Sequence, residues 1–353
     1  MKKSTKNLIN LLLLALLFVA LYFIEKWAGS TSMLMTVLKK GAVYALIAVS
    51  MNLLNGFTGL FSLGQAGFML VGAYTYAVLT IPVAKRIAVY QYYDGGLIQF
   101  ALPAILGILA AGAIAAIFAA LIGYPVLRLK SDYLAIATLG FAEIIRAIIQ
   151  WDVLGPITNG SNLLKTYPTF TTVLQPFLAA VICIGLIVLL INSTYGRAFK
   201  AIRDDEVAAE AMGINLFHHK QMAFVISSFF AGIGGALLAM YQSSLQANAF
   251  KSSMTYEILL IVVIGGMGSI TGSVLASFLF IACSEWWLRF LDSEQILFGV
   301  QVPLLRSGFR MVVFSVIIMV VVLFFRKGIM GERELWDLFK PKVKKNVGEA
   351  IKQ

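Results

Sequence analysis

The chain has 353 residues, of which 60% are hydrophobic and 13% are charged, and its formal net charge is +11. Ordinary soluble domains carry about twice this charged fraction, which excludes that class. The apolar runs are continuous rather than alternating, which excludes a transmembrane β-barrel as well. The sequence therefore predicts an all-α, polytopic helical membrane protein.

The positive charge does not indicate nucleic acid binding. The basic residues lie in short loops and in the C-terminal tail. An excess of lysine and arginine beside the membrane, in contact with anionic lipid head groups, explains this pattern more simply. The two cysteines, Cys183 and Cys283, fall inside apolar runs and are expected to be packing residues.

About ten apolar runs along the chain are read as crossings of a hydrocarbon core of about 30 Å. The first is followed by Glu25-Lys26-Trp27 rather than by small residues that a signal peptidase cleaves, so we expect a retained span. The eighth is short enough to be a half-helix or a re-entrant segment. The predicted spans are 8–24, 34–54, 59–81, 97–123, 132–150, 173–192, 221–241, 255–267, 269–288 and 308–325.

Ten crossings place both termini on one side of the membrane. That side carries more lysine and arginine than the other, so the termini and the loop 194–220 are predicted to be cytoplasmic. Residues 1–330 are expected to form a single transmembrane domain, and residues 331–353 a basic cytoplasmic tail. Lys39 and Lys40 fit least well, because they fall inside the second run, and the span is expected to start nearer Gly41.

Two clusters of glycine and serine stand at the start of predicted spans, at 59–64 and 266–272. Transporters are often built from two related halves with small residues where helices cross or break. Ordinary small-residue helix packing is the preferred explanation for either cluster alone. These clusters supply most of our candidates for a translocation path, which are Ser62, Gly64, Gln65, Gly266, Gly268 and Ser269.

Ionisable residues inside spans are costly and are therefore functional candidates. Glu143 and Arg146 lie three residues apart in the fifth span and share one helix face. They are either a polar lining of the translocation path or an internal ion pair that neutralises itself. Glu257, Glu285 and Arg310 lie near span ends, where their side chains are expected to reach the membrane surface.

A turn-rich loop, 155–162, lies outside the membrane in this topology. It is either a docking surface for an extracytoplasmic partner or a simple connection.

The charged segment 197–213 is the most informative part of the chain. It contains good helix formers, no interior glycine or proline, and Gly213 where a helix C-cap is expected. Ile202, Ala209 and a ladder at 198/201/205/208/212 place small and apolar residues at helical spacing. A helix that lays this stripe in a groove of a soluble partner explains the pattern better than a solvated loop does. The expected contact residues are Arg197, Arg203, Glu206, Ala208, Ala209, Glu210 and Gly213.

The sequence contains no catalytic constellation, and an enzyme is not expected. The adjacent histidines, His218 and His219, point about 100° apart on a helix and do not easily share a metal, so no metal site is predicted. The glycines at 265–272 lack the lysine of a phosphate-binding loop. Any ATP and magnesium must therefore be bound by another polypeptide, and this chain is expected to bind no cofactor.

Several motifs resemble one family. Residues 208–213 resemble the Ala-Ala-x-x-x-Gly core of the cytoplasmic loop in bacterial ABC importer permeases, with Val207 where the motif usually opens with glutamate. Residues 56–68 resemble the Thr-Gly-x-x-Ser-Leu-Gly-His-Ala-x-Phe signature of branched-chain amino acid permeases, with Gln65 in place of histidine. Thr158-Asn159-Gly160-Ser161-Asn162-Leu163 departs from the family's usual Thr-Gly-Gly-Ser-Asn-Gly. Further matching blocks are 127–139, 141–146 and 263–269.

The chain thus looks like a LivM-type permease subunit of a branched-chain amino acid ABC importer in the bacterial inner membrane. The resemblance implies a LivH-type permease partner, two cytoplasmic ATPase subunits, an extracytoplasmic substrate-binding protein, and leucine, isoleucine or valine as substrate. A permease for urea, short amides or another small solute is the alternative within the family. A membrane enzyme or a structural membrane subunit is the alternative outside it. An enzyme should show clustered His, Asp or Glu residues within the membrane, and this sequence has almost none, which argues against the enzyme.

Overall fold

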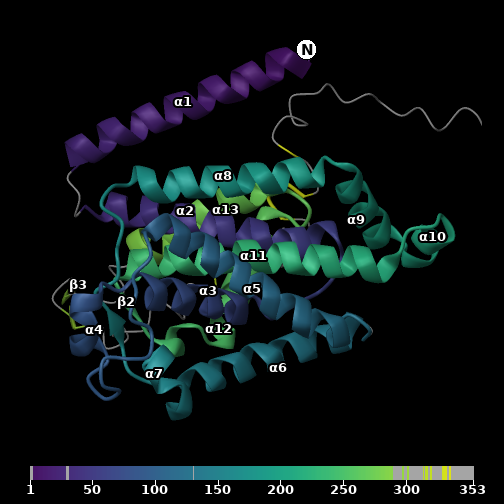
Figure 1. The fold of residues 1–353 in the computed structure, drawn as a ribbon. Coiled ribbons are helices and arrows are strands. Elements are labelled where there is room, and N and C mark those ends of the chain that lie inside the picture. The colour runs from purple at the N-terminus through teal and green to yellow at the C-terminus, as the bar shows by residue number, and fades with distance from the viewer. Residues whose placement is uncertain are drawn as a thin grey trace, which may run out of the picture.

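The computed structural model describes residues 3–28, 32–129 and 131–288, together with 296–297, 300–301, 313, 315–316, 319, 328–331 and 334. These residues are almost entirely helical (Figure 1), as the composition predicts. The α-helices are α1 Lys3–Ala28, α2 Met33–Asn52, α3 Gln65–Thr80, α4 Val83–Val89, α5 Ala104–Val126, α6 Ser131–Gln150, α7 Gly155–Thr158, α8 Leu174–Ile191, α9 Thr194–Asp204, α10 Glu206–Ala211, α11 Leu216–Gln242, α12 Ser252–Gly265 and α13 Ile270–Ala282.

Short elements extend or join these helices. Two π-helical turns, η1 Leu53–Phe57 and η4 Cys283–Trp287, continue α2 and α13, and two 3-10 turns are η2 Asp152–Leu154 and η3 Ala247–Ala249. Strands β1 Leu164–Lys165 and β2 Ser244–Leu245 pair antiparallel, with Leu164 opposite Leu245. Strands β3 Ile296–Leu297 and β4 Val300–Gln301 form a second antiparallel pair.

Among the described residues, seven helices are long and apolar enough to cross a membrane, or eight if the bent pair α3–α4 is one span. The seven coincide with the predicted spans 34–54, 97–123, 132–150, 173–192, 221–241, 255–267 and 269–288. Helix α1 covers the first predicted span. The tenth, 308–325, lies largely outside the described residues, so ten crossings with both termini in the cytoplasm stay a prediction.

The predicted span 59–81 is wrong as a straight helix. Residues 59–64 are not helical, α3 begins at Gln65, and α4 follows α3 at an angle of 120°. Pro82 stands at this bend, where it cannot donate a backbone hydrogen bond to the preceding turn. Arg86, only 1% exposed, stabilises the bend by donating to the carbonyl oxygens of Val78 (2.8 Å) and Phe100 (2.7 Å).

The second span also starts earlier than predicted, since α2 begins at Met33 and includes Lys39 and Lys40. Lys40 is accommodated because its ammonium group donates to Glu285 on η4 and lies 5.6 Å from the ring centroid of Tyr44. Glu285 therefore has an ion-pair partner within the protein, beyond the expected reach toward the membrane surface.

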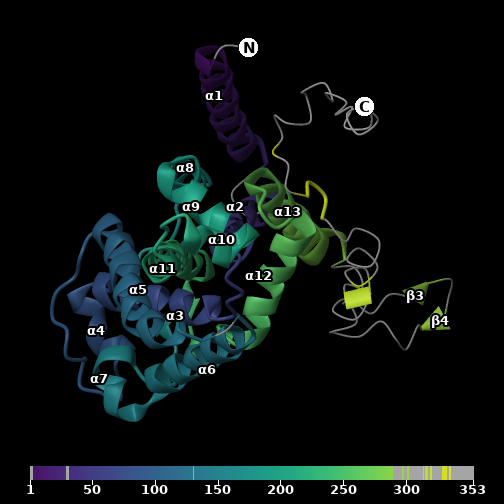
Figure 2. The same cartoon turned by 90° about the vertical axis from the view of Figure 1, so that its right-hand side faces the viewer.

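Helix α11 lies at the centre of the bundle and packs against α2, α3 and α5 (Figure 2). Close approach is possible because glycines face one another. A Cβ atom on Gly72 would lie 2.1 Å from the carbonyl oxygen of Gly232, and one on Gly235 would lie 2.0 Å from that of Met69. Such small-residue contacts are the usual way in which membrane helices associate, because lipid gives no hydrophobic driving force between them.

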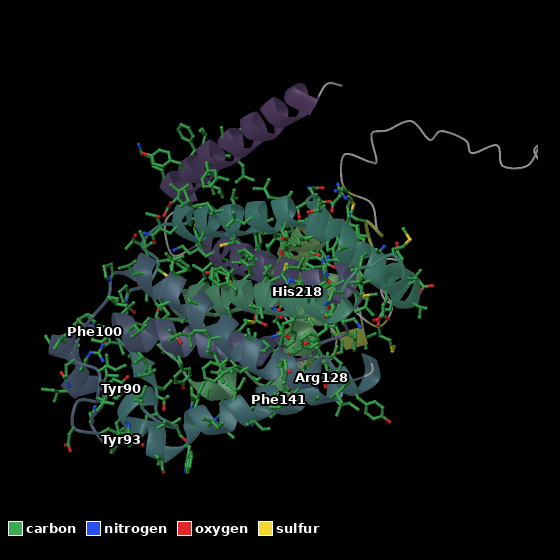
Figure 3. All side chains as sticks on the ribbon, turned by 45° about the vertical axis from the view of Figure 1, so that its right-hand side comes forward. Tyr90, Tyr93, Phe100, Arg128, Phe141 and His218 are labelled. Atoms are coloured by element: carbon green, nitrogen blue, oxygen red, sulfur yellow. The ribbon has the colours of Figure 1, made fainter. Side chains whose placement is uncertain are left out.

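The long helices run side by side, so the bundle has two ends (Figure 1). One end carries α9 and α10, and we call it the α9 end. The opposite end carries α4, α7 and β2, and we call it the α7 end. Figure 3 shows Tyr90, Tyr93 and Phe100 grouped at the α7 end, whereas Arg128 lies toward the α9 end.

Ile329, just before the predicted C-terminal tail, and Glu334, within it, both contact the bundle. The backbone N–H of Ile329 donates to the carbonyl of Ile264 at 2.7 Å. The carboxylate of Glu334 accepts hydrogen bonds from the backbone N–H groups of Ile270 (2.8 Å) and Thr271 (3.1 Å), at the N-terminus of α13. The remaining residues of 331–353 lie outside the described part of the chain, apart from Gly331.

Candidate functional site

A buried asparagine joins α2 to the turn between α12 and α13. Asn52 is fully buried, and its side-chain amide donates to the carbonyl of Ser269 (2.9 Å) and the hydroxyl of Ser273 (2.8 Å). Its side-chain oxygen accepts from the backbone N–H of Gly268 at 2.9 Å. We call Asn52, Gly56, Gly268, Ser269 and Ser273 the Asn52 junction. The turn that Asn52 holds contains Gly266 and Gly268, both with positive φ, and Asn52 supplies partners to two of its backbone groups.

The charged loop is attached to this junction through Arg203 of α9. The Arg203 guanidinium donates to the carbonyl of Gly56 at 3.3 Å and pairs with Asp204 at 2.9 Å. The Arg203 backbone also packs on Gly59, where an added Cβ would lie 3.1 Å from the Arg203 Cα. Arg203 is therefore engaged within its own chain and is not simply available to a partner, contrary to the sequence-based expectation.

The prediction that the segment 197–213 forms one helix is wrong, because it contains two. Helix α9 ends at Asp204, and the extended Asp205 caps α10 by accepting from the backbone N–H groups of Val207 (2.9 Å) and Ala208 (3.0 Å). Aspartate breaks helices in this way because its short side chain competes for backbone donors. Gly213 does end α10, as predicted, with φ +85° and the Gly213 N–H donating to Glu210.

The apolar face of this loop also differs from the predicted ladder. Phe199, Ile202 and Ala209 are buried against the rest of the chain. The apolar side chains that point outward are Val207, 78% exposed, and Met212, 83% exposed, both beside α10. Arg197, Ala208 and Glu210 are exposed as well, while Glu206 forms an ion pair with Lys220 of α11. The outward surface suited to a partner is thus α10 and its end rather than the whole segment.

The first glycine and serine cluster is buried in part, since Gly59 and Phe61 are exposed. Ser62 and Gln65 are both buried, and the Gln65 amide donates to the Ser50 hydroxyl of α2 at 2.7 Å. Gly64 packs on Thr138 of α6, since an added Cβ would lie 3.1 Å from the Thr138 carbonyl oxygen. In this arrangement the cluster holds the start of α3 between neighbouring helices, which is the packing alternative for Gln65.

Glu143 and Arg146 form the centre of a second polar region. They pair at 2.6 Å, and the hydroxyl of Ser252 on α12 donates to the other oxygen of Glu143. The Arg146 guanidinium also donates to Gln150 (3.2 Å) and Asn248 (3.4 Å). We call these five residues the α6–α12 polar cluster. The sequence predicted the ion pair, but the contribution of η3 and α12 depends on the pairing of β1 with β2, which places Asn248 beside α6.

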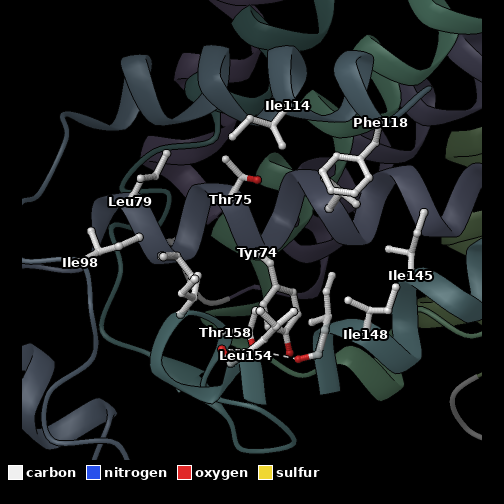
Figure 4. Close-up of a pocket in the computed structure, with 14 residues that line it drawn as sticks. Tyr74, Thr75, Leu79, Ile98, Ile114, Phe118, Ile145, Ile148, Leu154 and Thr158 are labelled. Atoms are coloured by element: carbon white, nitrogen blue, oxygen red, sulfur yellow. Dashed lines mark hydrogen bonds between the residues drawn. The ribbon is translucent and has the colours of Figure 1, made fainter. Parts of the chain in front are cut away.

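The other face of α6 lines an apolar cavity of about 310 Å³ (Figure 4). Its walls are Ile145, Ile148 and Ile149 of α6, with residues of α3, α5 and the α7 region. Among the described residues that line it, none is acidic or basic, and Tyr74, Thr75 and Thr158 are the polar ones. Successive residues on a helix point about 100° apart, so Glu143 and Arg146 lie on a different side of α6 from this cavity.

The loop 155–162 is partly structural. Thr158 and Asn159 are buried, and the Thr158 hydroxyl donates to the carbonyl of Ile149 at 2.8 Å. Asn159 has φ +62°, a conformation in which asparagine is the usual substitute for glycine, and its amide donates to Val89 and Leu163. Asn159 can therefore occupy a position where the family motif has glycine. Ser161 and Leu163 are exposed.

Sequence reasoning missed Asn52 and Asn248. Asn52 stands inside an apolar run, and the rule that polar groups within membrane spans need partners would have identified it. Asn248 lies in a loop and carries no comparable signal. Within the described residues, no group of three or more His, Cys, Asp or Glu side chains is placed to hold a metal ion.

The family model for the permease component of branched-chain amino acid transport systems matches residues 33–325. The chain belongs to this family. It is 32% identical over 291 residues to the high-affinity branched-chain amino acid permease protein LivM of Escherichia coli, covering 73% of this chain but only 64% of that protein. It is also 23% identical to the nucleoside ABC transporter permease protein NupC of Lactococcus lactis, covering 63% of this chain and 71% of NupC.

The permease protein LivH of Escherichia coli is 22% identical over 328 residues, covering 89% of this chain and 97% of LivH. No solved structure matches the chain. Its relatives are permease subunits of ABC transporters, which are not themselves enzymes. Together with the seven apolar helices, they identify the chain as a multi-pass protein of the inner membrane.

Proposed function

We propose that this chain is the permease subunit of an ATP-driven importer that passes leucine, isoleucine and valine into the cytoplasm by alternating access. Its partners are a LivH-type permease, two cytoplasmic ATPase subunits and an extracytoplasmic substrate-binding protein. ATP and magnesium are bound by the ATPase subunits. Similarity to LivM over most of the chain supports the substrate class.

The observation that carries the mechanism is the attachment of α9 and α10 to the Asn52 junction. Val207 and Met212 offer apolar contacts to an ATPase groove, and Arg203 connects the same loop to Gly56. Asn52, at the end of α2 and just before the η1 turn that contains Gly56, connects α2 to the turn between α12 and α13. A displacement of α10 by closing ATPase subunits would therefore be transmitted to α2, α12 and α13 together, which is the kind of linked movement that alternating access requires.

The proposal is tested in proteoliposomes that contain this chain with its partner permease, its ATPase subunits and its binding protein. We expect radiolabelled leucine to accumulate on the side of the membrane that carries the ATPase subunits, and only when ATP is present on that side. Replacing Val207 and Met212 by glutamate is expected to uncouple leucine uptake from ATP hydrolysis, because charged side chains are costly to bury in an apolar groove. Unchanged coupling in an assembled complex that carries both substitutions would contradict the role of α10.

The similarity to NupC supports a second candidate, a permease for another small solute. Urea, short amides and nucleosides are the solutes to compare. Each solute is added in excess to the leucine uptake assay, first without and then with the substrate-binding protein, and the inhibition of leucine uptake is measured. Stronger inhibition by urea or a nucleoside than by isoleucine or valine would favour this alternative.

A further inference from the structure

The α6–α12 polar cluster extends from Glu143, in the C-terminal half of α6, to Gln150 at the end of α6 and Ser252 at the start of α12. Glu143 is twelve residues from the start of α6, which corresponds to about 18 Å along a helix of about 30 Å. Its side chain is 36% exposed, and that of Arg146 is 23% exposed. Gln150 and Asn248 extend the cluster toward the α7 end. The cluster is therefore an ionised, partly exposed surface in the half of α6 that is nearer the α7 end.

Such a surface does not face lipid. Ionisable side chains within membrane-spanning segments face the interior of a bundle or a water-filled cavity, because contact with hydrocarbon is costly. Helix α5 exposes Ile105, Leu109 and Leu121, and α6 itself exposes Ile136 and Ile144 beside the cluster. The charged groups of Glu143 and Arg146, rather than these apolar neighbours, are therefore what requires water or another subunit at this place.

We propose that Glu143 and Arg146 bind the charged backbone of an amino acid during its passage, with the substrate carboxylate on Arg146 and the substrate ammonium group on Glu143. This inference rests on the proposed function, which supplies an amino acid as the solute. A zwitterion carries one charge of each sign close together, and the Glu143–Arg146 pair presents the complementary two. Arginine suits the carboxylate because its planar guanidinium can donate two parallel hydrogen bonds.

The hydrogen bonds of Arg146 allow this exchange. Its contacts with Gln150 (3.2 Å) and Asn248 (3.4 Å) are long and go to neutral amide oxygens, whereas a carboxylate offers charge-assisted bonds. Its two short contacts, at 2.7 Å from Nε and 2.6 Å from Nη2, both go to one oxygen of Glu143, and a substrate carboxylate must compete with that oxygen. Ser252 holds the Glu143 carboxylate from the opposite side, so Glu143 keeps its position when Arg146 turns toward the substrate. The substrate's ammonium group then replaces part of the charge that Arg146 supplies to Glu143.

The competing explanation is an ion pair that only neutralises itself. Double substitution distinguishes the two. If the pair acts only internally, Glu143→Gln and Arg146→Gln each leave one unpaired charge and are defective. The combined variant has no unpaired charge, so its uptake should be close to that of the wild type. If the pair binds substrate, the combined variant lacks both partners of the zwitterion and is as defective as the single variants.

The experiment measures ATP-dependent leucine uptake, and its half-saturating leucine concentration, in proteoliposomes with the complete complex. The matched control is Lys40→Gln with Glu285→Gln, which neutralises another half-buried ion pair on α2 and η4. We expect uptake at low leucine concentration to fall about tenfold or more in Glu143→Gln/Arg146→Gln and less than about twofold in the control, because charge-assisted hydrogen bonds are lost only in the first.

Two further outcomes define the test. Uptake by Glu143→Gln/Arg146→Gln within twofold of wild type, with both single variants defective, would overturn the inference alone. A wild-type complex that hydrolyses ATP but accumulates no amino acid would overturn the proposed function and the inference together. If the combined variant does not assemble, Arg146→Lys replaces it; a raised half-saturating leucine concentration with normal assembly is expected, and an unchanged one would contradict the inference.

Discussion

The Asn52 junction and the α6–α12 polar cluster are two polar regions of a largely apolar bundle, and they differ in what their polar groups contact. Asn52 is fully buried and bonds to the backbone of the turn between α12 and α13. Glu143 and Arg146 are partly exposed, and their hydrogen bonds go to side chains. The first arrangement completes the fold, whereas the second leaves ionised groups accessible.

This difference shows that a polar residue in a membrane helix has two uses. Where the chain breaks its helix, as at Gly266–Ser269, backbone groups need partners and a buried amide supplies them. Where the helix continues, as in α6, its backbone is already satisfied and a polar side chain is free to act elsewhere. Substitutions in the junction should therefore lower stability in addition to any effect on coupling, whereas those in the cluster should change transport with little change in stability.

The largest effect on stability is expected for Asn52→Leu. The substitution removes three hydrogen bonds of 2.8–2.9 Å and leaves the Gly268 N–H and the Ser269 carbonyl without this partner. We expect the free energy of unfolding to fall by about 2–4 kcal/mol, since lost hydrogen bonds and unpaired buried groups each contribute. Thermal unfolding of the purified chain in detergent measures it. A loss no greater than that caused by Ser273→Ala would contradict the central position of Asn52.

A matched pair of glycine substitutions compares the two regions directly. An added Cβ on Gly56 would lie 2.5 Å from the Gly268 nitrogen, whereas on Gly140 of α6 it would have no atom within 4 Å. Gly56→Ala is expected to destabilise the chain by about 1–3 kcal/mol through overpacking. Gly140→Ala is expected to be neutral or stabilising by up to about 1 kcal/mol, because alanine favours a helix. Equal unfolding temperatures for the two variants would refute this contrast.

Loss of a single cap in the junction has a smaller expected effect. The Ser269 hydroxyl caps α13 by accepting from the Gly272 N–H at 3.1 Å. Ser269→Ala is expected to cost about 1 kcal/mol, the usual value for an N-cap. Glu334 also accepts from this helix end, so removing both acceptors in Ser269→Ala/Glu334→Ala should cost more than either alone. Chemical unfolding of the single and combined variants measures the two contributions.

Much of the fold follows from the sequence, because each apolar run long enough to cross a membrane must form a helix there. This reasoning predicted the helices at 97–123, 132–150 and 173–192 well. It failed at 59–64, where the absence of helix depends on hydrogen bonds from other elements, such as that from Leu63 to Thr138. Hydropathy does not report such tertiary partners.

The site was predictable to a similar extent. The Glu143–Arg146 pair followed from a spacing of three residues on one helix. The break at Asp205 could have been expected from an aspartate inside a helical pattern, since aspartate caps helices better than it continues them. The outward position of Val207 and Met212 could not, because it depends on how α9 packs against Gly59 and Gly56.

The smallest expected change in stability is that of Glu143→Gln/Arg146→Gln, and it is the one that decides the comparison. The pair is partly exposed, and both glutamines retain hydrogen-bonding groups for Ser252 and Asn248, so we expect a change of only about 0.5 kcal/mol. The same purified protein is then used for thermal unfolding and for leucine uptake. A large loss of stability would mean that the cluster, like the Asn52 junction, serves the fold, and the distinction between the two regions would disappear.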